Sequence, residues 1–297
     1  MVSISSPWAL FVGRSSDLLS RSDSTKVRRK AAAKAMNRPA VASYLPLIDE
    51  LSRELVADLL STGHSGQVAF DPKPLLQNSI LDLTMTLNYG ARLPKDAFDE
   101  LTLVEHSVSR LRGPIGSFQD YLPFLRCNPI NVTSTFARAI GKRRLVYLGR
   151  FNKELEDRIN AGTDVPSIQA NVLKDPEAKL NDTELMSISM SMVSGGLDTM
   201  VHTLAWSIGA LARRPDIQDA AYDAICKVYG TEEWGNMEED EVPFVTALMK
   251  ECLRYFAVLR LALPRRAWRD IEYNGLRIPK GTTVVLNVWA CNRGKDL

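Results

Sequence analysis

The stretch that most constrains the fold runs from Asn181 to Pro215 and is predicted to be one long helix. Asn181 is a suitable N-cap, and Glu184 three residues later completes a capping-box pattern. Arg213 and Arg214 suit the negative end of the helix dipole, and Pro215 stops the helix. About 31 helical residues would span roughly 45 Å, the width of a sizeable domain. We therefore expect this helix to pass through the interior of a mainly helical protein.

Two adjacent glycines, Gly195 and Gly196, stand in the middle of this helix. Each costs about 1 kcal/mol relative to alanine, so something should require them. One use is to let a flat group or a small molecule approach the backbone. Asp198 and Thr199 follow at once, and an acid beside an alcohol can relay protons. The alternative is that the glycines admit a crossing helix and that Thr199 bonds back to the Gly195 carbonyl. These residues alone leave both readings open.

The composition is that of an ordinary globular chain. It has 297 residues, of which 45% are hydrophobic and 24% charged, and a net charge of +2 that argues against a nucleic-acid partner. No apolar run approaches the ~20 residues that cross a bilayer, so we expect no membrane segment in this sequence and a cytoplasmic chain as given. The four cysteines are scattered without CxxC spacing, which indicates neither a zinc site nor a disulfide framework.

Hydrophobic periodicity predicts a helical protein with a small antiparallel sheet near its C-terminus. Residues 1–22 have no pattern, residues 113–133 read as a loop, and residues 161–181 read as a polar connection. Asn274-Gly275 predicts a hairpin over residues 271–278, and the β-branched run 282–288 predicts a further strand. The other predicted helices are a short one from Lys26 ending near Pro39, and then 44–63, 74–89, 96–112, 136–159, 217–228 and 243–256.

Two groups of charged residues stand out. The first is basic and crowds one short helix: Lys26, Arg28, Arg29, Lys30, Lys34 and Arg38. It is interpreted as a solvated face, as a nucleic-acid contact that the balanced charge disfavours, or as a place where one or two arginines meet a buried anion. The second is Glu251 with Arg254, whose i,i+3 spacing places them on one helical face where they can form an ion pair. An exposed pair of this kind would be unremarkable by itself.

The order of these motifs resembles the cytochrome P450 family of haem-thiolate monooxygenases. Residues 195–199 match the family's oxygen-activation motif. The resemblance implies that Asp198 and Thr199 are catalytic and deliver protons, and that Gly195 and Gly196 lie at the cofactor. It also implies a mainly helical P450-like fold with haem as the cofactor.

Further residues match the family one by one. Glu251 and Arg254 match its invariant Glu-x-x-Arg core pair. Arg265 falls where the family places an arginine against a haem propionate, and Arg28 or Arg29 resembles the basic residue that meets the other propionate. That role would give the basic group its buried anion through bidentate pairing.

A closer similarity is to fungal hydroxylases of small aromatics, of the phenylacetate and cresol hydroxylase kind. Residues 28–33, 36–39 and 192–199 carry it. The resemblance implies insertion of one oxygen atom from O2 into a small, aromatic substrate, in aromatic catabolism or secondary metabolism. It also implies electrons from an NADPH-cytochrome reductase, and an endoplasmic reticulum membrane location for a full-length relative.

The sequence departs from the family at both ends. The family's haem cysteine lies in a Phe-x-x-Gly-x-Arg-x-Cys loop, and the sequence reaches Leu297 before it, so no residue is assigned to the iron. Cys291 matches a segment upstream of that loop. A downstream arginine that completes the Glu251–Arg254 network is absent too, which predicts a partly unsatisfied pair. Residues 1–22 are expected to be an irregular segment with a mispredicted insert, and residues 23–297 a partial, truncated P450 domain.

Two alternative functions follow. One is a haem-free, catalytically inactive remnant of the family that acts as a binding or structural protein. The other, an unrelated helical scaffold, is disfavoured because the motifs and the hairpin occur in family order.

Overall fold

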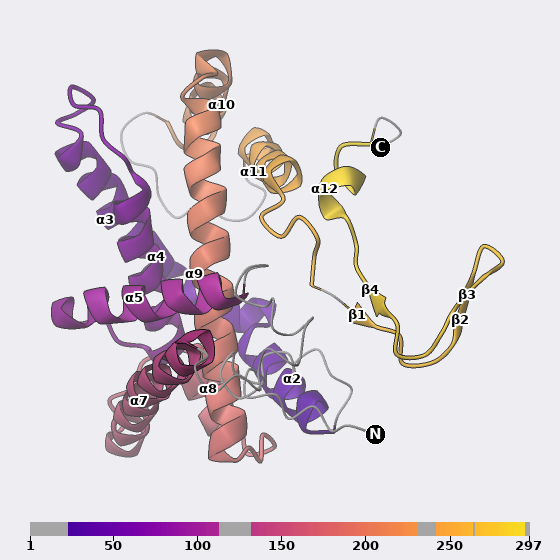
Figure 1. Cartoon of the computed structure of the whole chain (residues 1–297). Helices are drawn as coiled ribbons and strands as arrows, with labels where there is room; N and C mark the ends of the chain where they lie inside the picture. The colour runs from indigo at the N-terminus through magenta and orange to yellow at the C-terminus, as the bar shows by residue number, and fades with distance from the viewer. Residues whose placement is uncertain (1–22, 113–131, 231–241, 264, 295–297) are drawn as a thin grey trace. The chain divides into compact units, whose positions relative to one another are not determined.

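The computed structural model describes residues 23–112, 132–230, 242–263 and 265–294 (Figure 1). The chain divides into two compact units, Met1–Asp198 and Thr199–Leu297, and each is described by itself. The division falls inside one continuous helix, α9 (Asp182–Leu211). The predictions for residues 1–22, 113–131 and 295–297 lie outside the described residues.

All regular secondary structure in the described part of the first unit is helical. The sequence signals explain where several helices begin and end. Asn37 accepts a hydrogen bond from the Ala40 amide at 3.0 Å and so caps a helix that has Pro39 in its first turn. Gly90 ends another with φ of 68°, a left-handed conformation that suits glycine. The helices are α2 (Asp23–Ala35), α3 (Arg38–Thr62), α4 (Lys73–Tyr89), α5 (Lys95–Arg112), α7 (Val132–Ala161), α8 (Ile168–Lys174) and the first part of α9.

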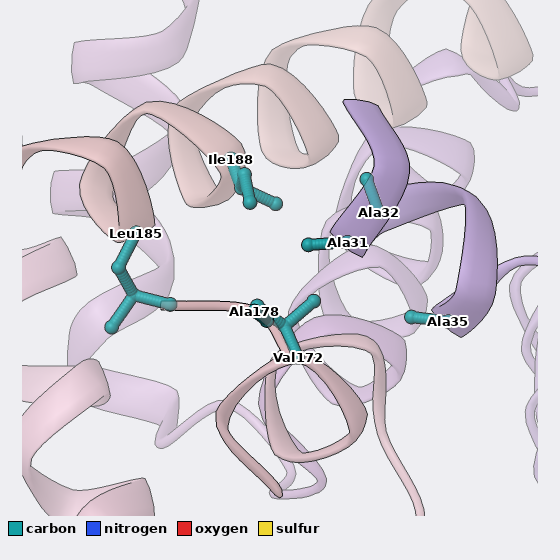
Figure 2. Close-up of a cluster of buried hydrophobic side chains, with 7 residues drawn as sticks. All are labelled: Ala31, Ala32, Ala35, Val172, Ala178, Leu185 and Ile188. Carbon is teal, nitrogen blue, oxygen red and sulfur yellow. The ribbon is translucent and has the colours of Figure 1, made fainter. Parts of the chain in front are cut away.

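The core of this unit forms around α4 and α9. Helix α4 buries residues on most of its circumference, from Leu76 to Tyr89. At one side, three alanines of α2 pack against apolar residues of α8, the segment after it, and α9 (Figure 2). The small alanine side chains let the helix backbones approach closely, which buries the apolar stripe of α2. The residues of this cluster are Ala31, Ala32, Ala35, Val172, Ala178, Leu185 and Ile188.

The start of the long helix is confirmed in detail. The Glu184 amide donates to Asn181 Oδ1 at 3.0 Å, and the Asn181 amide donates to Glu184 Oε2 at 3.1 Å, which is the reciprocal pattern of a capping box. The helix ends at Leu211, and Pro215 opens the next helix, α10 (Pro215–Tyr229).

The second unit holds the end of α9 with α10, α11 (Pro243–Phe256) and a short α12 (Val288–Cys291). Its strands form two antiparallel pairs, β1 (Arg265–Arg266) with β4 (Thr283–Val284) and β2 (Ile271–Tyr273) with β3 (Leu276–Ile278). The predicted hairpin is confirmed, since Asn274 and Gly275 turn with φ of 50° and 74°. The expected fold class, mainly helical with a small antiparallel sheet near the C-terminus, is therefore correct.

Two predictions of local structure were wrong. The connection over residues 161–181 contains α8, whose N-cap Ser167 accepts from the Ala170 amide, and whose seven residues are too few to show a period. The strand predicted over residues 282–288 is only Thr283–Val284, because the Asn287 side chain accepts from the Ala290 amide and starts the helical turn of α12. Among the described residues, no helix is both long and apolar enough to span a membrane.

Candidate functional site

The Gly195-Gly196 step lies inside α9, which continues through it. A Cβ added at Gly196 would lie 2.9 Å from Oγ1 and 3.0 Å from Cγ2 of Thr84 on α4. Among the described residues, none lies within 4 Å of a Cβ added at Gly195, and this glycine is exposed. The packing reading therefore applies to Gly196, where α4 crosses α9, whereas the described residues leave room for a Cβ at Gly195.

Asp198 and Thr199 are consecutive residues of α9, and both are half-buried. Asp198 closes the first unit, where the Ser109 hydroxyl of α5 donates a hydrogen bond to its Oδ2 atom. Thr199 opens the second unit, and its carbonyl accepts from the Thr203 hydroxyl one turn later at 2.7 Å. Gly195 precedes Thr199 by one helical turn, so this glycine and the hydroxyl share one face of α9.

A hollow of about 430 Å³ lies in the second unit, with Thr199 in its wall. Most of the lining is apolar, and among the described lining residues Arg265 alone is charged. Arg265 is exposed on β1, and none of the described residues pairs with its guanidinium. The hollow therefore combines an apolar wall, a hydroxyl and a free cation. Its lining residues are Thr199, Thr203, Leu253, Ala257, Val258, Leu259, Ala262, Leu263, Arg265, Val288 and Asn292.

Glu251 and Arg254 form an ion pair on α11, with Arg254 Nε 2.7 Å from Glu251 Oε2. The hydrogen bond from Arg254 holds the pKa of the Glu251 carboxyl below its usual range. Arg254 also donates to the Asn292 carbonyl, and the Asn292 side-chain amide donates back to the Arg254 carbonyl at 3.0 Å. The expectation of a partly unsatisfied pair therefore missed Asn292, which supplies a further acceptor for Arg254 and ties the end of α12 to α11.

The basic helix α2 belongs to the first unit. Arg28 is only 3% exposed, and its Nη1 atom donates to the Ser187 hydroxyl of α9 at 2.6 Å. Arg29, its neighbour, is exposed. Lys30 and Lys34 both pair with Glu177 at the surface, so part of the group is a solvated face. The structure thus separates Arg28 from the rest of the basic group, because its side chain contributes to helix packing.

A buried charged cluster in the first unit was not found from the sequence. The Glu105 carboxylate on α5 accepts from two atoms of Arg144 on α7, at 2.7 and 3.1 Å, and both residues are almost fully buried. The Tyr147 and Ser194 hydroxyls also donate to this carboxylate. Burial, and then the charge of Glu105, raise the pKa of Tyr147 well above its ordinary value. In the sequence, the members of this cluster look like ordinary polar residues of amphipathic helices. The only signal that could have indicated the cluster is Ser194, which stands directly before the glycine pair.

The comparison with family models decides the identity. A model described as Cytochrome P450 matches residues 11–297, nearly the whole chain. The chain belongs to the cytochrome P450 family. A solved structure of a zebrafish cytochrome P450 with abiraterone has the same fold. It matches with a TM-score of 0.72 at 15% sequence identity, and the match covers 96% of this chain and 68% of the zebrafish chain.

Curated P450 relatives include fungal hydroxylases of aromatics, as the sequence predicted. A 3-hydroxyphenylacetate 6-hydroxylase of Emericella nidulans is 49% identical over 281 residues, 93% of this chain and 54% of that protein. A phenylacetate 2-hydroxylase of the same organism is 44% identical over 278 residues, 91% of this chain and 53% of that protein. The chain therefore spans about half the length of the curated relatives that it matches.

The P450 family implies haem, and the residues present fit that group. A haem is flat and largely apolar, with acidic propionates at one edge, and the hollow offers an apolar wall with the free Arg265 guanidinium. Cys291 is exposed on α12 and is not proposed as a ligand of the iron. Within the described part of the chain, no three histidine, cysteine or acidic side chains gather into a metal site.

Proposed function

We propose that the protein to which this chain belongs is a monooxygenase that inserts one oxygen atom of O2 into a small aromatic substrate. The observation that carries the proposal is the arrangement on α9, where an acid and an alcohol lie two and three residues after the glycine pair and the alcohol lines an apolar hollow. The substrate class is taken from the two relatives, which are named as hydroxylases of 3-hydroxyphenylacetate and phenylacetate. When bound, haem with a thiolate ligand would supply reductive activation of dioxygen.

Residues of this chain would bind the haem and supply protons to the reaction. In this proposal the Thr199 hydroxyl donates a hydrogen bond into the hollow, and Asp198, its neighbour, holds the proton that restores it. Arg265 would pair with a propionate at the edge of the haem. Arg29, which is exposed on α2, and the buried Arg28 are proposed for a second propionate, although Arg28 already bonds to Ser187. Glu251 and Arg254 would hold α11 and α12 together without touching the substrate.

The apolar lining would exclude water from the reacting atoms. The described lining residues besides Arg265, Asn292 and the two threonines are alanine, valine or leucine. Such a wall favours the flat, apolar face of a haem over a polar group, because burying a polar group without a partner costs free energy. As further parts of the proposal, an NADPH-cytochrome reductase supplies the electrons, and the full-length protein resides at the endoplasmic reticulum membrane.

The test uses the full-length, haem-loaded protein. We expect a reduced carbon monoxide difference spectrum typical of thiolate-ligated haem, and hydroxylation of phenylacetate or 3-hydroxyphenylacetate detected by mass spectrometry. Thr199→Ala and Asp198→Asn should each lower kcat by roughly 100-fold, because a placed proton donor contributes about that much. Ser191→Ala is the matched control: its hydroxyl bonds back to the Ser187 carbonyl of the same helix, so kcat should not change. A full-length protein that takes up no haem would contradict the proposal and favour the inactive remnant.

A further inference from the structure

Helix α5 contacts α9 on both sides of the glycine pair. On one side, the Ser194 hydroxyl of α9 donates to Glu105 Oε2 of α5 at 3.2 Å. On the other side, the Ser109 hydroxyl of α5 donates to Asp198 Oδ2 of α9. Gly195 and Gly196 lie between these two contacts.

The spacing of the two contacts is matched. Glu105 and Ser109 are four residues apart on α5, and Ser194 and Asp198 are four residues apart on α9. Four residues are about 6 Å along a helix, so the same length of each helix separates the contacts. The chemistry alternates as well, since each helix supplies one hydroxyl and one carboxylate. A slip of one residue between the helices would break both contacts together.

The buried ion pair fixes this register. Arg144 of α7 bonds to the Glu105 carboxylate through two atoms, and the same guanidinium donates to the Met190 carbonyl of α9 at 3.0 Å and to the Ser194 hydroxyl. Arg144 is 1% and Glu105 3% exposed. Breaking such a pair leaves an uncompensated buried charge, so the cluster resists displacement. Helix α5 is therefore held against α9 one turn before the place where Ser109 meets Asp198.

We propose that Ser109 is a positioning residue, which holds the Asp198 carboxyl group beside Thr199, and that the Arg144–Glu105 pair keeps α5 in the register that this contact needs. The inference deepens the proposed function and rests on Asp198 acting as a proton donor. The geometry supplies the reason for the contact: Asp198 lies two residues after Gly196, and a glycine step leaves the backbone more freedom than any other residue would. A hydrogen bond from another helix restricts the carboxyl group to one orientation.

The first experiment tests whether the contact exists, independently of activity. Chemical unfolding of the full-length, haem-loaded protein is followed for Ser109→Ala, Asp198→Ala and the double variant. If the two side chains bond, the shifts in the unfolding midpoint are not additive, because the second substitution removes a contact already lost. Ser107→Ala is the matched control on the same helix, since its hydroxyl bonds back to the Leu103 carbonyl. Its shift should add to that of Asp198→Ala.

The second experiment tests the positioning role. Ser109→Val is compared with Ser109→Thr, because the valine and threonine side chains have nearly the same shape and only threonine keeps the hydroxyl. We expect Ser109→Val to lower kcat by about tenfold with KM unchanged, since orientation of the acid affects the proton transfer and not substrate binding. Ser109→Thr should restore most of the lost kcat. This pair also keeps the test valid if Ser109→Ala does not fold.

The possible outcomes are distinct. Non-additive unfolding shifts, with loss of kcat in Ser109→Val and its recovery in Ser109→Thr, support the inference. Additive shifts, or equal kcat for the valine and threonine variants, overturn it. If Asp198→Asn itself leaves kcat unchanged, the proton-donor role fails and the positioning role fails with it, even where the unfolding experiment shows the contact.

Discussion

At the scale of single residues, the adjacent glycines of α9 have opposite surroundings. Thr84 of α4 would lie within 3.0 Å of a Cβ at Gly196, whereas no residue in the described part of the chain lies within 4 Å of a Cβ at Gly195. Thr84 is β-branched and buried, so it cannot turn away easily. One glycine is therefore needed for packing, and the other is available for function.

This contrast predicts opposite effects of alanine on stability. Gly196→Ala should lower the free energy of unfolding by about 1–2 kcal/mol, because overpacking costs about 1–3 kcal/mol and the gain in helix propensity returns up to about 1 kcal/mol. Gly195→Ala should raise it by up to about 1 kcal/mol, since only the propensity term remains. Chemical denaturation of both variants measures the difference. Thr84→Ser, which removes Cγ2, should relieve part of the Gly196→Ala loss; equal effects of the two alanines would show that α4 and α9 do not touch there.

The same pair separates stability from function. If Gly195 gives the haem access to the backbone, Gly195→Ala should weaken haem retention even though it stabilises the helix. Titration of the apoprotein with haem, followed by absorbance, measures this. Unchanged haem affinity in Gly195→Ala would mean that this position on α9 is not used.

At the scale of the elements, α5 and α7 are joined by two ion pairs of different burial. Arg144–Glu105 is almost fully buried, and Arg143–Glu100 is exposed, with side chains 46% and 40% accessible. The two arginines are neighbours in sequence, which gives a matched comparison. Arg144→Met should cost about 3–5 kcal/mol of unfolding free energy, because Glu105 is left as a buried, unpaired charge. Arg143→Met should cost about 0–1 kcal/mol.

Chemical denaturation of these two variants tests whether the buried cluster holds the helices together. Comparable costs for the two substitutions would mean that water reaches Glu105. A double variant, Arg144→Met with Glu105→Leu, should recover much of the stability, because it replaces the pair with apolar groups.

The same cluster predicts how stability depends on pH. Burial raises the pKa of Tyr147, so the folded state keeps the phenol protonated after the unfolded state has lost its proton. The stabilisation is complete below the unfolded pKa of about 10 and decreases as pH rises from there through the folded pKa, with a slope of up to about 1.4 kcal/mol per pH unit. Tyr147→Phe should flatten this alkaline slope. Unfolding measured from pH 9 upward checks it, with the exposed Tyr273→Phe as the control.

At the scale of the whole molecule, the two units differ in how much they bury. Helix α4 of the first unit has many buried residues, whereas α10 and α11 of the second have none among the described residues. Large apolar side chains of the second unit, such as Trp206, Trp268 and Leu276, are more than half exposed. Exposed apolar surface of this kind marks a region whose stability depends on something bound to it.

This difference predicts uneven protection in the 297-residue chain. Backbone amides of α10 and α11 should exchange with deuterium faster than those of α4 and α7, because few buried contacts oppose their local opening. Hydrogen exchange followed by mass spectrometry compares the helices within one sample. A single cooperative thermal transition with equal protection throughout would contradict this prediction.

The sequence by itself determined the features that depend on near neighbours. The capping box of Asn181 and Glu184 acts across three residues, and the Asn274-Gly275 turn acts across two, so both were predicted correctly. The ordered motifs of α9 and α11 also identified the family, because each is a short string of residues. The short helix α8 and the start of α12 were missed, since a few residues show no period.

Only the tertiary structure decided which distant side chains meet. Glu105 and Arg144 are 39 residues apart, and Ser109 and Asp198 are 89 residues apart. Position 196 requires glycine because Thr84 of α4 lies against it where the two helices cross, and no sequence pattern near either residue indicates this contact. The physical reason is that helical periodicity fixes the face a residue occupies, but the crossing of helices fixes what that face contacts. The candidate catalytic pair could be read from the sequence, and its surroundings could not.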